Sequence, residues 1–134
     1  LLQSPHQEVV RQALDALGSL ASDLDEQSLA GIEAVVTLDR AEWRVPLVQR
    51  GWTAHDQVRM NAAALLLNAV TSGSRLPGLE GLLETVLQRG SGYAAAIAAE
   101  ALVRLKTPTA IETALRYYAD RCWDDTLLGA AKSF

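Results

Sequence analysis

Two histidines and one cysteine are the side chains of this sequence best suited to catalysis or metal binding. His6 and His55 lie far apart in the chain, and neither has a partner at a metal-ligand spacing, so we predict no metal site. Asp56 follows His55 directly, but adjacent residues of a helix point in different directions and do not form an acid–base pair. Asp56 is better placed to stabilise the positive end of a helix. Arg59, one turn further on, can pair with it or with a neighbouring helix.

The remaining chemical candidates also favour structural roles. Cys122 falls on the apolar side of an expected helix without an identifiable base, which is typical of a buried, inert thiol. The stretch RGSGY, residues 89–93, lacks the lysine and the preceding strand of a phosphate-binding loop, and is typical of a turn between helices. We therefore predict no catalytic residue and no cofactor, and the balance favours a protein that is not an enzyme.

Aromatic and arginine side chains on helix surfaces are better candidates for function, because such residues dominate the binding energy of many protein interfaces. In a helix over 108–123, Tyr117 falls opposite the apolar face. In a helix over 40–52, Trp43 falls on a second face, beside the apolar stripe formed by Ala41, Val45, Val48 and Trp52. The candidate partner-binding residues are Trp43, Arg116, Tyr117, Arg121 and Trp123. The alternatives are that Trp43 packs against a neighbouring helix and that Trp123 plugs the end of a helical array.

The composition favours one all-helical domain spanning residues 1–134. Hydrophobic residues make up 49% of the chain but aromatic residues only 5%, so the strong helix formers alanine and leucine supply most of the apolar content. A net charge of −4 with scattered lysine and arginine argues against nucleic-acid binding. No apolar run approaches the roughly 18 residues that span a bilayer, and a single cysteine is compatible with a reducing cytosol, so we expect a cytoplasmic protein. The first residue is Leu1, which leaves open whether the chain is a fragment.

Helix-start signals divide the chain into seven expected helices. Ser4-Pro5 and Thr107-Pro108 each combine a capping hydroxyl with a first-turn proline. Asp39 to Glu42 has the spacing of a capping box, and Thr53 to Asp56 is a weaker version. The expected helices cover residues 5–21, 26–38, 40–52, 54–71, 76–89, 92–106 and 108–123. Pro46 should kink or split the third of them.

Three alanine- and leucine-rich segments align without gaps, namely RQALDAL at 11–17, RMNAAAL at 59–65 and AIAAEAL at 96–102. A second expected helix follows each one. The offsets are 48 and 37 residues, and the longer offset contains the additional helix over 40–52. Helix pairs that repeat at about 40 residues are typical of a solenoid, in which the first helix of a pair is buried on more than one side. We therefore predict that Ala63 and Ala99 are buried where helices cross closely.

The helices HQEVVRQALDALGSLA and HDQVRMNAAALLLNAV resemble the first helix of HEAT-like repeats, particularly the alanine-rich kind in phycobilisome-lyase-type proteins. That pattern is an acidic residue, then valine and arginine, then an alanine-leucine run, and Glu8, Val10 and Arg11 begin it here. The third unit has Ala96 in place of the arginine. The resemblance covers most of residues 5–123. It implies an all-α fold, a right-handed α-α superhelix forming a short HEAT-like solenoid of about three helix pairs plus one extra helix.

Two functions of different classes follow. The first is a non-enzymatic scaffold or adaptor that binds a protein partner through the surface of its second helices. The alternative, which rests on the resemblance alone, is a lyase or chaperone subunit that handles a bilin or another tetrapyrrole for a client protein. The last residues, 124–134, include Leu127, Leu128 and Phe134. They either fold back over the last repeat as a cap or dock on a partner, and the sequence does not decide between the two.

Overall fold

The computed structural model describes residues 1–46, 52–90 and 92–121, and over that part of the chain it contains six α-helices. They are α1 (Gln7–Gly18), α2 (Glu26–Thr37), α3 (Ala54–Thr71), α4 (Leu79–Arg89), α5 (Tyr93–Leu105) and α6 (Pro108–Asp120). Two single-turn 3-10 helices, η1 (Ala21–Asp23) and η2 (Ala41–Trp43), lie between them. The only β-type pairing in the described residues is an isolated bridge between Pro46 and Thr53. The predicted all-α class is confirmed.

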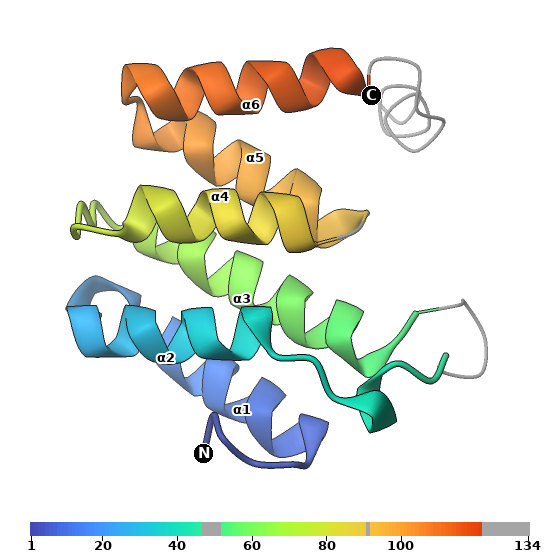
Figure 1. Ribbon diagram of the computed structural model, residues 1–134. Coiled ribbons are helices and arrows are strands. Elements are labelled where there is room, and N and C mark those ends of the chain that lie inside the picture. Colours follow the sequence, from blue (N-terminus) through green and yellow to red (C-terminus); the bar gives the residue numbers. More distant parts are fainter. Residues whose placement is uncertain (47–51, 91, 122–134) are drawn as a thin grey trace, which may run out of the picture.

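The helices lie in two layers (Figure 1). In one layer α3 packs between α1 and α5, and in the other α2 packs against α4, with α6 continuing the row at the far end of the molecule. Three consecutive helix pairs therefore stand side by side. The right-handed superhelix stays a prediction. Among the described residues, no helix combines the length and apolar character needed to cross a membrane.

The middle of the array is packed with small side chains. Helix α3 contacts α1 on one side and α5 on the other, so its buried residues do not form a single stripe. Ala63 and Ala99 are both fully buried, as predicted. Five alanines of α5 share this environment, namely Ala94, Ala95, Ala98, Ala99 and Ala101. A methyl side chain lets two helix axes approach closely, and leucines such as Leu66 and Leu102 fill the remaining space.

The helix-start signals have mixed outcomes. Thr107 caps α6 by accepting a hydrogen bond from the backbone N–H of Ala110, as predicted. At α3 the capping box is complete, although its sequence signal was the weaker one. The Thr53 and Asp56 side chains each accept a hydrogen bond from the other residue's backbone N–H. The prediction for Ser4 is wrong. Helix α1 begins at Gln7, and the Ser4 hydroxyl instead accepts from the backbone N–H of His6, with 3.2 Å between oxygen and nitrogen.

The extra helix predicted over residues 40–52 is wrong for its described part. The chain forms only the single turn η2 and then reaches Pro46, whose backbone pairs with Thr53. A proline removes one helical hydrogen bond and clashes with the preceding turn, so the turn does not continue. The Asp39 side chain does not cap a helix; it accepts from Arg44, with 2.7 Å between Nε and Oδ1. Residues 47–51 lie outside the described part of the chain.

A candidate partner-binding edge

One edge of the array collects the starts of α1, α3 and α5 and the ends of α2, α4 and α6, at the right in Figure 1. Arg59, in the second turn of α3, joins three of these helix ends. Its Nε donates to the carbonyl oxygen of Val36 at 3.1 Å, and its Nη1 donates to that of Arg89 at 3.4 Å. The two carbonyls lie in the last turns of α2 and α4, where backbone carbonyl groups lack partners within the helix. Arg59 therefore ties the ends of α2 and α4 to α3.

The surroundings of Arg59 identify it as a structural residue. Burial lowers the pKa of its guanidinium, and nearby Asp56 opposes that shift. The sequence left open whether Arg59 pairs with Asp56 or with a neighbouring helix, and the structure shows hydrogen bonds to two neighbouring helices. In the third pair the equivalent position is Ala96, so that pair lacks this link.

Trp43 lies inside the protein. Only 4% of its surface is exposed, its Nε1 donates to the carbonyl oxygen of Pro5 at 3.1 Å, and its ring meets that of His55 with 5.3 Å between centroids. The predicted exposure of this residue is wrong, because it rested on a helix over 40–52 that does not form. The chain instead turns after η2 and directs the indole against the segment that precedes α1. Trp43 is therefore removed from the candidate surface.

His55 anchors the connection between α2 and α3. Its side chain is 5% exposed, and Nε2 accepts from the backbone N–H of Arg40 at 3.0 Å. Burial lowers the pKa of His55, so the neutral ring is favoured, and Nε2 also lies 3.1 Å from the carbonyl oxygen of Arg40. Asp39 lies 3.7 Å from Nε2, but its carboxylate is bound by Arg44, which lowers the pKa of Asp39. This arrangement holds a loop in place and presents no acid–base pair to a substrate.

The predicted residues of α6 divide into two environments. The Arg121 guanidinium lies over the Tyr117 ring, 4.9 Å from its centroid, and the Tyr117 and Tyr118 rings meet edge to face at 5.5 Å. Arg116 points elsewhere and pairs with Glu112 at 3.0 Å in the exposed part of the helix. Tyr118 is half-buried, and desolvation raises the pKa of its hydroxyl. The structure thus brings together Tyr117 and Arg121 but leaves Arg116 in a separate ion pair.

A second aromatic pair at the same edge is absent from the sequence-based candidates. The Trp52 ring, just before α3, and the Tyr93 ring, at the first residue of α5, lie 5.4 Å apart. Tyr93 is 56% exposed and Trp52 is partly exposed. The prediction assigned Trp52 to the apolar stripe of the helix that does not form. One local signal could have identified Tyr93, namely a tyrosine directly after a glycine-serine-glycine break.

We call the surface formed by Trp52, Tyr93, Tyr117 and Arg121 the aromatic edge. Trp123 and Cys122, which the sequence singled out, lie outside the described residues. Within residues 1–46, 52–90 and 92–121 there is no group of three or more histidine, cysteine, aspartate or glutamate side chains arranged to hold a metal ion.

The comparisons with known proteins add no family assignment to this geometry. No protein-family model, no curated protein and no solved structure matches the chain. The function must therefore be inferred from the residues and their arrangement.

Proposed function

We propose that this chain is a HEAT-like protein-interaction module that binds a partner protein at its aromatic edge. The observation that carries the proposal is the exposed Tyr93 side chain, whose ring packs at a tilt against that of Trp52 with 5.4 Å between centroids. Two large rings that support one another offer apolar contact area with little loss of side-chain freedom on binding. A tyrosine exposed over more than half its surface gains the free energy of burial when a partner covers it.

Arginines at the same edge indicate the chemistry of the partner. Arg121 lies over Tyr117, and Arg89 ends α4. Among the described residues, neither guanidinium has a carboxylate within ion-pair distance. Arginine stacked on an aromatic ring keeps its hydrogen-bond donors available to a carboxylate. The expected partner segment therefore carries apolar side chains flanked by aspartate or glutamate.

Capture from a lysate of the source cells with the purified chain as bait tests this function, followed by titration of each captured protein. The double variants Trp52→Ala/Tyr93→Ala and Tyr117→Ala/Arg121→Ala remove the two halves of the aromatic edge. We expect each to weaken binding by about 2 kcal/mol or more, roughly 30-fold in Kd, as for interface hot spots.

Leu20→Ala is the matched control, because Leu20 is 54% exposed, close to the value for Tyr93, and lies beyond the opposite end of α1. It should leave the affinity unchanged. A partner that binds both double variants as tightly as the unaltered chain would show that the aromatic edge is not the binding surface. The alternative of a tetrapyrrole carrier gains no support from the described residues, since its one nucleophilic candidate, Cys122, lies outside them.

A further inference from the structure

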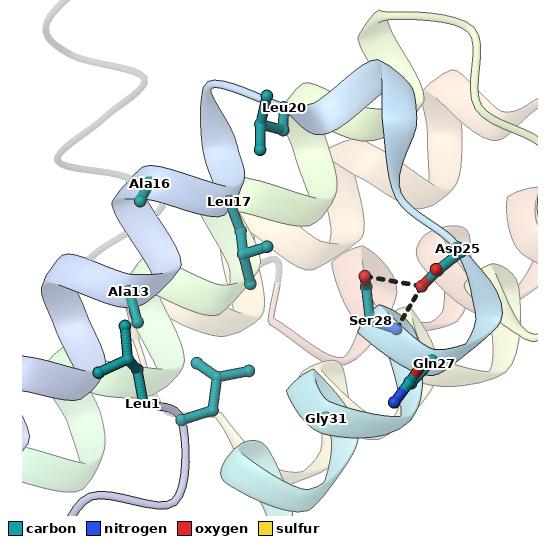
Figure 2. A pocket seen from close by; sticks show the side chains of 10 residues that line it. Leu1, Ala13, Ala16, Leu17, Leu20, Asp25, Gln27, Ser28 and Gly31 are labelled. Carbon is teal, nitrogen blue, oxygen red and sulfur yellow. Dashed lines mark hydrogen bonds between the residues drawn. The ribbon is translucent and has the colours of Figure 1, made fainter.

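The first helix pair carries an open apolar groove on the side away from α3. The groove has a volume of about 430 Å³ and lies between α1 and α2 (Figure 2). Leu17 points from α1 into the space between the two helices, and Leu1 lies beside Ala13. At its far end, Asp25 accepts hydrogen bonds from the backbone N–H and the hydroxyl of Ser28. Asp25 and Ser28 thus satisfy one another, Gln27 lies beside them, and the remaining side chains that line the groove are apolar.

Comparing α1 with the equivalent helix of the next repeat, α3, shows which helix surface lines this groove. The α1 side chains that line it are Ala13, Ala16 and Leu17, with Leu20 just beyond the helix. At the repeat offset of 48 residues, their equivalents in α3 are Asn61, Ala64, Leu65 and Asn68. These four α3 residues face α1, where they line a crevice together with Asp15 and Gly18. The side of α1 that lines the groove therefore corresponds to the side of α3 that packs against α1, the preceding helix of the same layer.

The opposite end of the array presents the complementary surface. Within the chain, three residues of α1 form the surface against which α3 packs. Arg11 donates to the side chain of Gln57 at 3.0 Å, Asp15 accepts from Asn61 at 2.9 Å, and Gly18 lies against Leu65, where a Cβ atom would come within 3.9 Å of its Cδ1. Adding the two offsets gives 85 residues, so their equivalents in α5 are Ala96, Glu100 and Val103.

This α5 surface is open and apolar at its centre. Val103 is 41% exposed, and Leu115 of the adjacent α6 is 60% exposed. Glu100 is close enough to Tyr118 to raise the pKa of its hydroxyl, which places Tyr118 beside the same surface. No described residue covers Val103 or Leu115, so within the described part of the chain both ends of the stack expose the faces that pack against each other in its interior.

The charges of the two ends differ. Residues 1–38 contain six acidic residues and one arginine, whereas residues 93–134 contain five basic and five acidic residues. Two first-pair ends would repel one another, but a last-pair end offers a first-pair end no such net repulsion. This difference disfavours a symmetric dimer through the groove and favours contact between unlike ends.

We propose that copies of this chain associate head to tail, with the α1–α2 end of one copy seated on the α5–α6 end of the next. In this contact Leu17 of one copy packs against Val103 of the other, as Leu65 packs against Gly18 within one chain. Ala16 of the first copy lies over Glu100 and Val103 of the second. Because the two surfaces differ, each added copy leaves one end of each kind exposed, and the assembly grows beyond a dimer.

Sedimentation of the full chain over a range of concentration and salt tests the proposal. The mean mass should rise with concentration past that of a dimer, at low salt and at high salt, because the contact buries mainly apolar side chains. Ala16→Glu blocks the first end, because it would face Glu100, and Val103→Glu blocks the last, and each variant should be monomeric where the unaltered chain associates. Circular dichroism confirms that both variants are folded, and Gln88→Arg on α4, away from both ends, should associate normally.

A mixture of the two blocked variants gives the decisive result. Ala16→Glu keeps an intact last end and Val103→Glu keeps an intact first end, so together they should form a one-to-one dimer and nothing larger. A symmetric contact cannot restore association in this way. An unaltered chain that is monomeric at every concentration, one whose mass stops at a dimer, or a mixture of folded variants that does not pair would each overturn the proposal.

Discussion

The crossing of α3 and α5 and the connection between α2 and α3 are both well buried, but they are held together in different ways. At the crossing, fully buried alanines such as Ala63 and Ala98 let the two helices approach closely. At the connection, Trp43 and His55 are as deeply buried, yet each is fixed by a hydrogen bond to a backbone atom of a distant segment. Repetition of one small residue stabilises the first region, and a few individual contacts stabilise the second.

Replacing Trp43 with alanine is expected to have the largest effect. The change empties a buried site between the segment before α1 and the start of α3 and removes the bond to Pro5. We expect a loss of about 3–5 kcal/mol in the free energy of unfolding, as for other buried aromatic side chains. Urea denaturation measures the loss. Trp43→Phe, which keeps most of the ring contact, should lose clearly less, and equal losses would show that volume does not determine stability here.

Enlarging Ala99 to leucine should have a smaller effect at the other region. The side chain is fully buried in α5, and the added atoms have no space without moving a neighbouring helix. We expect a destabilisation of roughly 1–3 kcal/mol by overpacking. The matched control is Ala30→Leu on the exposed side of α2, which should change stability little. If thermal melts showed no difference between the two variants, the close packing of α3 and α5 would not be limiting.

The smallest expected effect is the pH dependence of stability that His55 contributes, in the connection between α2 and α3. Because burial lowers the pKa of His55 in the folded protein, the unfolded chain takes up a proton first as pH falls. The contribution of His55 is therefore complete above its unfolded pKa, about 6.5, and is lost as pH falls from there toward the lower folded value. Around this ring, Asp39 favours protonation, whereas Arg44 and Arg59 oppose it.

Denaturation curves between pH 5 and 8 measure this dependence, a window chosen to bracket the ordinary histidine pKa of about 6.5. His55→Gln should flatten the profile in that window, and the exposed His6→Gln should leave it unchanged. A profile that stays the same after His55→Gln would assign the pH dependence to another group.

Helix content and repeat spacing could be predicted because they depend on local preferences and on a pattern that recurs three times. Alanine and leucine favour helix wherever they occur, and the equivalence of Arg11 with Arg59 is visible in the letters alone. The region over 40–52 lacks such a recurrence. Its apolar spacing fits a helix, but Pro46 and the pairing of Asp39 with Arg44 direct it into a single turn and a loop.

The candidate surface shows the same division. Tyr117 and Arg121 could be chosen from the sequence because both lie on one continuous helix whose faces follow from its period. Trp43 was misplaced and Tyr93 was missed, because their exposure depends on how separate segments pack. The amino-acid sequence by itself determined that this protein is helical, that its helices come in repeated pairs and that its tightest crossings use alanine. The tertiary structure alone decided which aromatic rings are buried, which two meet at the edge and which helix faces stay open, because burial depends on neighbours distant in the chain.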